Sequence, residues 1–354
     1  MTAAARGWWV KGAIAGIIAC AVYLVCNGVL LFYLARIAVG YLGMPRRQVH
    51  AVGPSFPTGD YHQHLLSPAM TAFLKAPKPF MAADLIPLLD QAHVRRAVLL
   101  SLAYQYGNPY KQPVADEYVK VKAENDWTAA QAAVYPDRLV AFCGVNPLRD
   151  YAVAEVDRCA ASPDLKTGLK LHFGNSDVDL DNPEHVAKLR KVFAAADRHG
   201  MAIVVHLHAN VDHHKAYGAT EARVFLKQVM PSAPHVVIQI AHLAGAGGYD
   251  DPADDQALSV FVQAIAAHDA AVRNLYVDIS GVAGVGQWKG KKELLAQRIR
   301  AIGIQRILYG SDGAWTDFTP TKAVAAFHQL PLSAEELRAI DANEPPYVPM
   351  ELDD

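Results

Sequence analysis

The chain is poor in charged side chains and has almost no excess of either sign. Only 19% of its 354 residues are charged, where about a quarter is usual, and 33 basic residues offset 35 acidic ones. A formal charge of −2 creates no long-range field that would collect a polyanion, so nucleic acid is not an expected partner. A small-molecule substrate is the better expectation, and this length buries a sizeable core.

Charge is missing altogether between Ala13 and Ala35. About 23 residues of helix span roughly 34 Å, enough to cross a hydrocarbon core of about 30 Å. A cleaved signal peptide has a shorter apolar stretch, and the run continues well past Cys20, which disfavours a lipoprotein signal. The sequence therefore predicts an N-terminal single transmembrane helix over residues 13–35, with the lipid bilayer as a partner. Residues 1–12 would form its flank and residues 36–57 a linker.

The orientation of this predicted helix rests on few residues. Arg6 and Lys11 precede the apolar run, whereas Arg36, Arg46 and Arg47 follow it, so the basic residues are divided between both sides. We read the run as a signal anchor with the N-terminus inside. The expectation is a single-pass membrane protein whose catalytic domain lies on the exported side.

Cysteine is scarce, with four residues in the whole chain. Cys20 and Cys26 lie in the apolar run, Cys143 lies in a predicted strand and Cys159 in a predicted helix. This distribution does not resemble a disulfide framework. Cys143 and Cys159 are therefore expected to be two buried thiols.

From about residue 58, short runs rich in Val, Ile and Leu alternate with longer stretches of helical periodicity, which is typical of βα units around a parallel sheet. We expect a (β/α)8 TIM barrel over residues 58–354. An open doubly wound sheet is disfavoured because no Gly-rich phosphate-binding motif follows the first strand. The predicted strands are Gly59–Leu65, Arg96–Ala103, Leu139–Val145, Thr167–Phe173, Ala202–His208, His235–Leu243, Leu275–Ser280 and Arg306–Ser311.

Polar residues fall at the ends of these apolar strands. In Asp60-Tyr61-His62-Gln63-His64 the two histidines are two positions apart, so on a strand they project to the same side. Further strands end in polar residues at Lys170, His206, His242 and Asp312. The carboxyl ends of barrel strands converge on one mouth, where catalysis takes place. Imidazole and carboxylate groups suit Zn²⁺ and related divalent ions, so a metal site is expected there.

Other polar residues are candidates for contacts with substrate. Ser101, Asn146 and Ser280 end the second, third and seventh strands. His172 and His208 share a strand face with Lys170 and His206 respectively, and they are expected either to support the metal ligands or to touch substrate.

This ordered set of motifs resembles the amidohydrolase superfamily, specifically its amidohydrolase-related branch. The resemblance lies in the Asp-x-His-x-His opening, the strand-four Gly168-x-Lys170-Leu171-His172, the histidines of strands five and six, and Gly310-Ser311-Asp312. It covers about residues 58–345 and excludes the apolar run.

The resemblance implies that His62, His64, His206 and Asp312 bind one or two catalytic divalent ions, most simply Zn²⁺, with His242 beside them. Asp312 would take a proton from the activated water and deliver it to the leaving group. His242 would stabilise the developing oxyanion. Lys170 would be a metal ligand only if it is carbamylated and bridges two ions; otherwise it would bind a substrate carboxylate.

Three functions remain open at this stage. The leading hypothesis is a membrane-anchored, metal-dependent hydrolase of an amide, ester or lactone bond. The alternative implied by the same resemblance is a zinc-dependent non-oxidative decarboxylase, and Lys170 with His172 favours hydrolysis only mildly. The third is a barrel that binds ligands without catalysis.

Overall fold

Eight parallel strands form one sheet in the computed structural model, which describes Tyr23 and residues 55–210, 215–246, 249, 251–281, 291–313 and 318–348. Each strand pairs with the next one along the chain, from first to last. The strands are β1 (Gly59–Gln63), β2 (Arg96–Leu100), β3 (Leu139–Gly144), β4 (Gly168–His172), β5 (Ala202–His206), β6 (Ile238–Ile240), β7 (Leu275–Asp278) and β8 (Ile307–Leu308).

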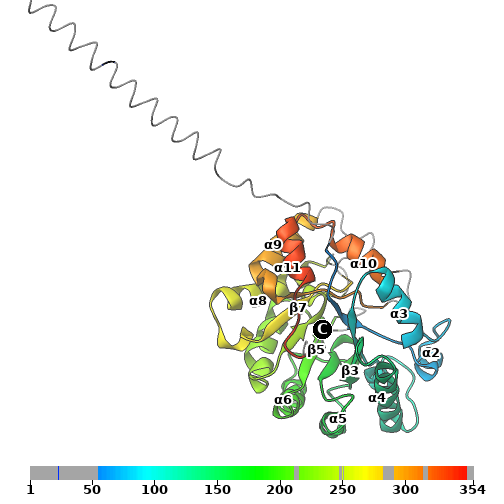
Figure 1. Ribbon diagram of the computed structural model, residues 1–354. Helices are drawn as coiled ribbons and strands as arrows, with labels where there is room; N and C mark the ends of the chain where they lie inside the picture. The colour runs from blue at the N-terminus through cyan, green and yellow to red at the C-terminus, as the bar shows by residue number, and fades with distance from the viewer. Residues whose placement is uncertain are drawn as a thin grey trace, which may run out of the picture. The chain divides into compact units, whose positions relative to one another are not determined.

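Backbone hydrogen bonds join the first strand to the segment that follows the last. The N–H of Tyr61 donates to the carbonyl of Tyr309 at 2.9 Å, and the N–H of Asp312 donates to the carbonyl of His62 at 2.8 Å. The sheet thereby returns to its first strand, and Figure 1 shows helices surrounding the strands. The eight predicted strands and the barrel are confirmed.

The strands are shorter than the sequence predicts, mainly at their carboxyl ends. The prediction placed His242 and Leu243 inside the sixth strand, but β6 ends at Ile240. Both residues have left-handed backbone angles, with φ of 57° and 50°, which no strand contains. The polar strand ends therefore belong to the loops of the mouth, meaning the end of the barrel at which the strands terminate.

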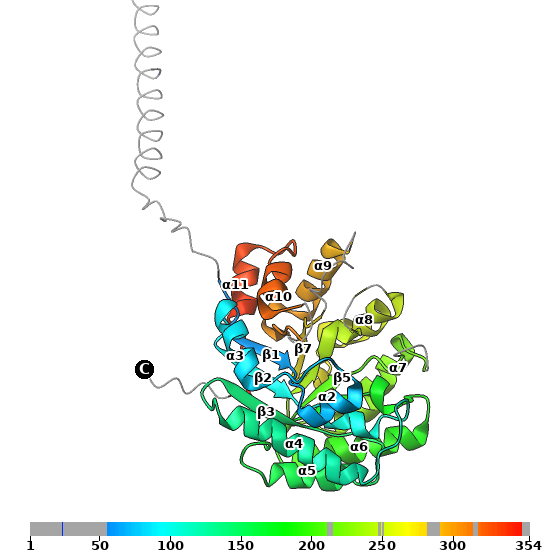
Figure 2. The ribbon, with the colours of Figure 1, turned by 90° about the vertical axis from the view of Figure 1, so that its right-hand side faces the viewer.

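Helices follow the strands on the outside of the barrel (Figure 2). Several begin at residues whose side chains cap them, as Asn182 does for Glu184 N–H ahead of Pro183. They are α2 (Pro68–Leu74), α3 (Ala82–Gln91), α4 (Glu117–Ala133), α5 (Ala152–Ala160), α6 (Pro183–Arg198), α7 (Ala219–Val224), α8 (Pro252–Ala266), α9 (Lys292–Ile302), α10 (Pro320–Phe327) and α11 (Ala334–Asp341).

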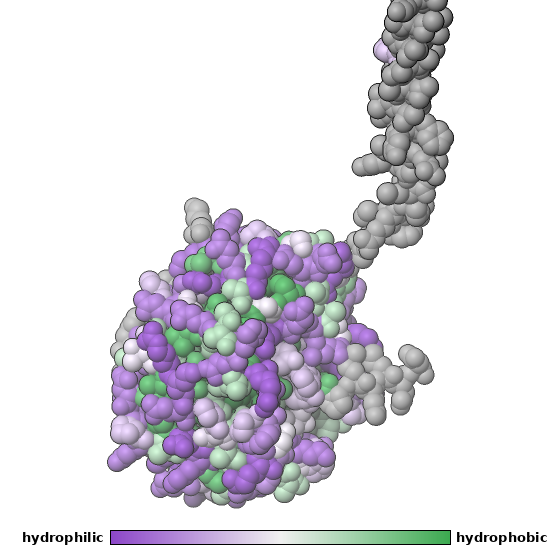
Figure 3. Space-filling model, turned by 90° about the vertical axis from the view of Figure 1, so that its left-hand side faces the viewer, coloured by the Kyte–Doolittle hydropathy of each residue, from purple (hydrophilic) through white to green (hydrophobic). Residues whose placement is uncertain are grey.

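The helices bury one face against the strands. In α6, for example, Leu189, Val192 and Phe193 are buried and the intervening charged residues are exposed. On the face drawn in Figure 3, hydrophilic side chains predominate and hydrophobic ones are scattered among them.

The prediction of a single-pass membrane protein with an exported catalytic domain is corrected here. None of the helices in the described part of the chain is long and apolar enough to cross a membrane. The predicted transmembrane helix over residues 13–35 lies outside the described residues, except for Tyr23.

The described segment that follows α11 packs into the barrel at the end opposite the mouth. Val348 belongs to a buried apolar cluster with side chains that point inside the barrel, among them Tyr61 and Phe142, and the partly buried Tyr347 packs against this cluster. The Tyr347 hydroxyl donates to Gln239 Oε1 of β6 at 2.5 Å. The segment after α11 thus closes the barrel and completes its inner core.

The expectation of two buried thiols is wrong, because Cys143 and Cys159 form a disulfide with a Cα–Cα distance of 6.2 Å. Cys143 lies near the end of β3 and Cys159 lies in α5, the helix that follows it. Both residues are fully buried. A strand and the helix that follows it are adjacent layers in a βα unit. Residues that face each other between these layers can therefore meet, although they are 16 positions apart in the sequence.

Candidate metal centre

Three of the predicted metal ligands meet at the mouth of the barrel. The Nε2 atoms of His62 and His64, in and just after β1, each lie 3.6 Å from Oδ1 of Asp312, which follows β8. The three ligand atoms all lie within 4.8 Å of one another. The two histidines are buried, whereas the Asp312 side chain is 38% exposed. The group is therefore closed toward the barrel and open toward solvent.

The backbone near β8 lets this group form. A Cβ atom at Gly310 would lie 2.8 Å from Cβ of His62 and 2.9 Å from Cβ of Ser280, too close for any side chain. Asp312 has a φ of 74°, an unusual value for a residue other than glycine. Glycine thus admits the close approach of β1 and β7, and the strained turn directs the Asp312 carboxylate back toward the two histidines.

Hydrogen bonds fix which nitrogen of each histidine faces the group. His64 Nδ1 lies 2.6 Å from the carbonyl of Leu100, and His62 Nδ1 lies 3.0 Å from a carboxylate oxygen of Asp278. Because a carbonyl and a carboxylate only accept, Nδ1 must donate in both cases. The lone pair of each ring is then on Nε2, the atom that points to Asp312.

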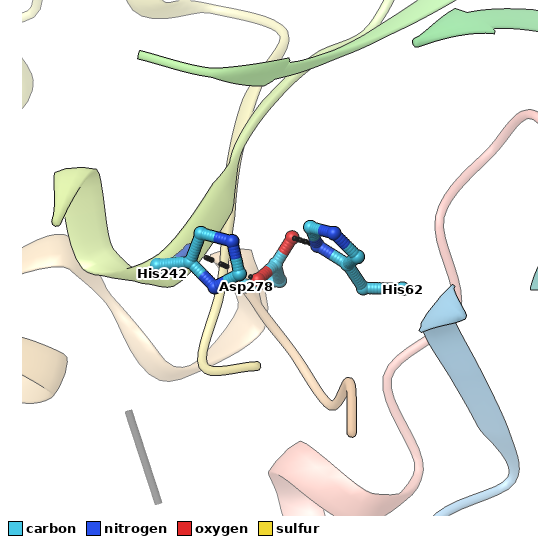
Figure 4. Close-up of side chains that lie close together, drawn as sticks. All are labelled: His62, His242 and Asp278. Atoms are coloured by element: carbon cyan, nitrogen blue, oxygen red, sulfur yellow. Dashed lines mark hydrogen bonds and ion pairs between the residues drawn. The ribbon is translucent and has the colours of Figure 1, made fainter. Parts of the chain in front are cut away.

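Asp278, at the end of β7, is a residue of this centre that the sequence analysis missed. Figure 4 shows its carboxylate between His62 and His242. It accepts hydrogen bonds from His62 Nδ1, from Gln239 Nε2 at 2.6 Å, and from the backbone N–H groups of His242 and Ser280 at 3.0 and 3.1 Å. It also follows the apolar run Leu275-Tyr276-Val277. A polar residue at the end of an apolar strand is the same pattern that identified the other candidate residues.

His242 lies beside this carboxylate in a strained turn. Its Nδ1 donates to the carbonyl of Ser280 at 2.7 Å, and its ring centroid lies 4.7 Å from that of His62. His242, Leu243 and Ala244 form a run of left-handed residues with φ between 50° and 65°. Such a run costs free energy and occurs mainly where a site requires it. The turn presents the imidazole to the mouth instead of continuing β6.

His206 stands slightly apart from the first three ligands. Its ring stacks on that of His172 with centroids 3.8 Å apart, and lies 4.9 Å from the ring of His242. Its buried Nε2 has no hydrogen-bond partner among the residues that the structure describes. A buried nitrogen without a partner is costly unless a ligand meets it, which fits an imidazole kept for a metal ion.

The electrostatics also fit a divalent ion. Burial, followed by the nearby Lys170 charge, lowers the pKa of His62 to about 4 and that of His64 well below its usual range. Burial also lowers the pKa of His206 well below its usual range. These imidazoles are thus neutral at neutral pH, the form that binds metals. Burial alone would raise the pKa of Asp312, but the surrounding imidazoles and Lys170 outweigh it and keep the carboxylate ionised.

Lys170 of β4 lies inside the centre. Its side chain is 1% exposed, and its Nζ lies 3.0 Å from His62 Nε2. Burial lowers its pKa to about 8, while Asp312 and Asp278 oppose that shift. Near neutral pH the side chain is therefore mainly an ammonium, which donates hydrogen bonds but cannot bind a cation.

We expect one equivalent of divalent metal per chain, both in the wild type and in Lys170→Ala. The reason is that His62, His64 and Asp312 already provide a facing set of ligand atoms without the lysine. Elemental analysis of the purified full chain measures this, with the exposed Lys188→Ala as control. Two equivalents in the wild type that fall to one or none in Lys170→Ala would instead identify Lys170 as a carbamylated bridge.

Two of the predicted substrate contacts, Ser280 and His172, lie beside the metal centre, whereas the contacts of Asn146 are with backbone groups. The Ser280 hydroxyl lies within 3.0 Å of Nδ1 of both His62 and His242, and His172 stacks on His206, so both residues border the centre. The Asn146 amide is held by the backbone of Gly107 and Leu148.

The remaining candidates lie around the centre. His208 Nε2 lies 3.3 Å from Asp254 of α8, and the hydroxyl of Ser101 accepts from the backbone of Ala103. Tyr104, which no strand pattern identified, is buried with its ring 5.3 Å from that of His172.

A family model described as amidohydrolase matches residues 60–341 of the chain. Among solved structures, 5-carboxyvanillate decarboxylase of Sphingomonas paucimobilis is similar at 16% identity, with a TM-score of 0.57 over 81% of this chain and 97% of that one. A probable 2-pyrone-4,6-dicarboxylic acid hydrolase of Acinetobacter baumannii is 18% identical, with a TM-score of 0.53 over 80% and 96% of the two chains.

A third similar structure, an amidohydrolase of Burkholderia multivorans with bound zinc, is 14% identical, with a TM-score of 0.54 over 81% and 96% of the two chains. At these identities the similarity shows a shared fold. Comparison with curated proteins finds no significant match.

Proposed function

Because the chain belongs to the amidohydrolase family, we propose that it is a metal-dependent enzyme that removes CO₂ from a small aromatic or other unsaturated carboxylic acid. The observation that carries the proposal is the buried Lys170 ammonium beside the group formed by His62, His64 and Asp312. As an ammonium, Lys170 can bind the carboxylate of an acid but cannot bridge two metal ions, so its presence does not favour hydrolysis. The decarboxylase of Sphingomonas paucimobilis provides the reaction type, and the acid it acts on is aromatic.

The proposed ligands of the ion are His62, His64 and Asp312, with His206 adjacent. A divalent ion bound there would supply positive charge that stabilises the negative charge developing on the substrate. Zn²⁺ and Mn²⁺ both suit imidazole and carboxylate ligands. Asp278 keeps His62 in the tautomer whose Nε2 would be free to bind an ion, since it accepts the Nδ1–H.

The residues around the ion would bind the acid and handle one proton. Lys170 would donate a charge-assisted hydrogen bond to an anionic oxygen of the substrate. Loss of CO₂ breaks a carbon–carbon bond and leaves the electron pair on the substrate carbon, to which Asp312 would deliver a proton. An anionic substrate next to Asp312 raises the pKa of that carboxyl and so favours the protonated form. The exposed side of Asp312 would regain the proton from water.

Hydrolysis is the second candidate, and one observation favours it. Neighbouring imidazoles and Lys170 lower the pKa of Asp312, and an ionised carboxylate is the form that accepts a proton from an attacking water. In that reaction Asp312 would pass the proton to the leaving group, and His242 would stabilise the oxyanion.

We expect the full chain to release one CO₂ for each molecule of acid consumed from a panel of hydroxylated and unsaturated carboxylic acids. Chelation should lower this rate at least about 10-fold, because the ion stabilises the transition state, and added Zn²⁺ or Mn²⁺ should restore it. Coupled CO₂ detection and product chromatography measure both quantities, with aryl esters, lactones and amides as the parallel panel.

Two results of this experiment would reject the proposal. Metal-dependent cleavage of an ester, lactone or amide without CO₂ release would assign hydrolysis instead. Turnover that survives complete removal of metal would reject both reactions as written.

A further inference from the structure

A cavity of about 530 Å³ lies outside the metal centre, between α2, α4 and the short helix η1 (Ala103–Gly107). Its walls are mainly apolar and include the aromatic side chains of Phe73, Tyr106 and Trp127. Cavities of roughly this size commonly hold small organic ligands. None of the predicted metal ligands lines it, so it is a separate candidate site.

The acidic residue among those that line it is Glu124, on α4. Glu124 is 3% exposed, and its Oε2 accepts a hydrogen bond from the Ser67 hydroxyl at 2.6 Å. The same hydroxyl accepts from the N–H of Met70 and so caps α2. The Ser67 hydroxyl therefore has no further hydrogen to donate to the second oxygen of Glu124.

That second oxygen, Oε1, is buried and has no hydrogen-bond partner within the described part of the chain. Nor does any described Lys, Arg or His form an ion pair with Glu124. Burial raises the pKa of Glu124 to about 7. Glutamate is almost never fully buried unless it is paired, and an unpaired perturbed carboxyl in a cavity wall is typical of a binding site.

We propose that this cavity binds a primary amine with an apolar body, whose ammonium group donates to Oε1 of Glu124. A cation supplies both the missing hydrogen bond and the missing positive charge, whereas an alcohol or amide supplies only the first. The aromatic rings of Phe73, Tyr106 and Trp127 surround the apolar body, and their faces attract a cation.

The protein's own basic side chain at the cavity is the exposed Lys120, one helical turn before Glu124. Lys120 forms no ion pair with Glu124 in the described structure, although residues four apart on a helix are neighbours. Reaching Oε1 would require its long side chain to enter the cavity and lose rotamer freedom. A free small-molecule amine, by contrast, can bury its own apolar body in the cavity.

The test is titration calorimetry of the full chain with 2-phenylethylamine and with the uncharged 2-phenylethanol. We expect one amine to bind per chain, and the alcohol to bind at least 10-fold more weakly. Glu124→Gln keeps the shape of the side chain and its bond to Ser67 but removes the charge. This variant should bind the amine at least 10-fold more weakly than the wild type.

A second variant tests the cavity itself. Ala123 is exposed and lines the cavity, so Ala123→Leu narrows it without disturbing the core and should also weaken amine binding at least 10-fold. Equal amine binding by the wild type and Glu124→Gln, equal binding of amine and alcohol, or no binding by the wild type would each overturn the proposal. The measurement needs no turnover, so its outcome is independent of the proposed decarboxylation.

Discussion

Replacement of Asp312 by asparagine is expected to lower kcat at least about 1,000-fold, because the proton that completes the reaction comes from this carboxyl. Asparagine has almost the same shape and keeps a carbonyl oxygen for the metal ion, but it has no acidic proton. Most of the metal should therefore remain bound. The experiment measures kcat and metal content on the same preparation.

The control for this substitution is Asp150→Asn, a fully exposed carboxylate that forms an ion pair with Lys188. It removes the same charge and should change kcat by less than about 2-fold, as expected for a surface position. An Asp312→Asn enzyme with full metal content and a kcat within 10-fold of the wild type would remove Asp312 from the proton transfer.

Replacement of Asp278 by asparagine is expected to lower both metal affinity and activity by about 100-fold. The two oxygens of Asp278 accept from His62, Gln239, His242 and Ser280. Either orientation of an asparagine amide turns an NH₂ group toward donors and releases His62 from its fixed tautomer. Measurement of the metal dissociation constant, alongside kcat, detects this directly.

The metal affinities of two variants distinguish the positioning of His62 from a general loss of stability. Gln239→Ala removes one donor to Asp278 but leaves His62 bound to the carboxylate, so it should weaken metal binding far less than Asp278→Asn. If Asp278→Asn bound metal as tightly as the wild type, Asp278 would be a structural residue alone.

Much of the barrel could be predicted from the sequence, because a strand buried on both faces leaves a continuous apolar run and each run here ends in polar residues. That pattern predicted that His62, His64 and Asp312 would lie at one mouth, together with Lys170, His206 and His242. It required only the convergence of strand ends, which the fold imposes.

What the sequence did not predict depends on side-chain direction and on the backbone beyond the strands. Asp278 ends an apolar run like its neighbours, but only coordinates reveal that it accepts from His62. The pairing of Cys143 with Cys159 needed the distance between β3 and α5. The end of β6 at Ile240 follows from left-handed residues, which local composition does not encode.

The closure of the barrel by its two ends has a consequence for synthesis on the ribosome. His62 is made early, whereas Asp312 follows 250 positions later (312 − 62), and Tyr347, whose hydroxyl contacts Gln239 inside the barrel, follows later still. A nascent chain therefore holds only part of the centre until Asp312 has been made. A chain that stops before Asp312 would lack one of the three proposed ligands that face one another.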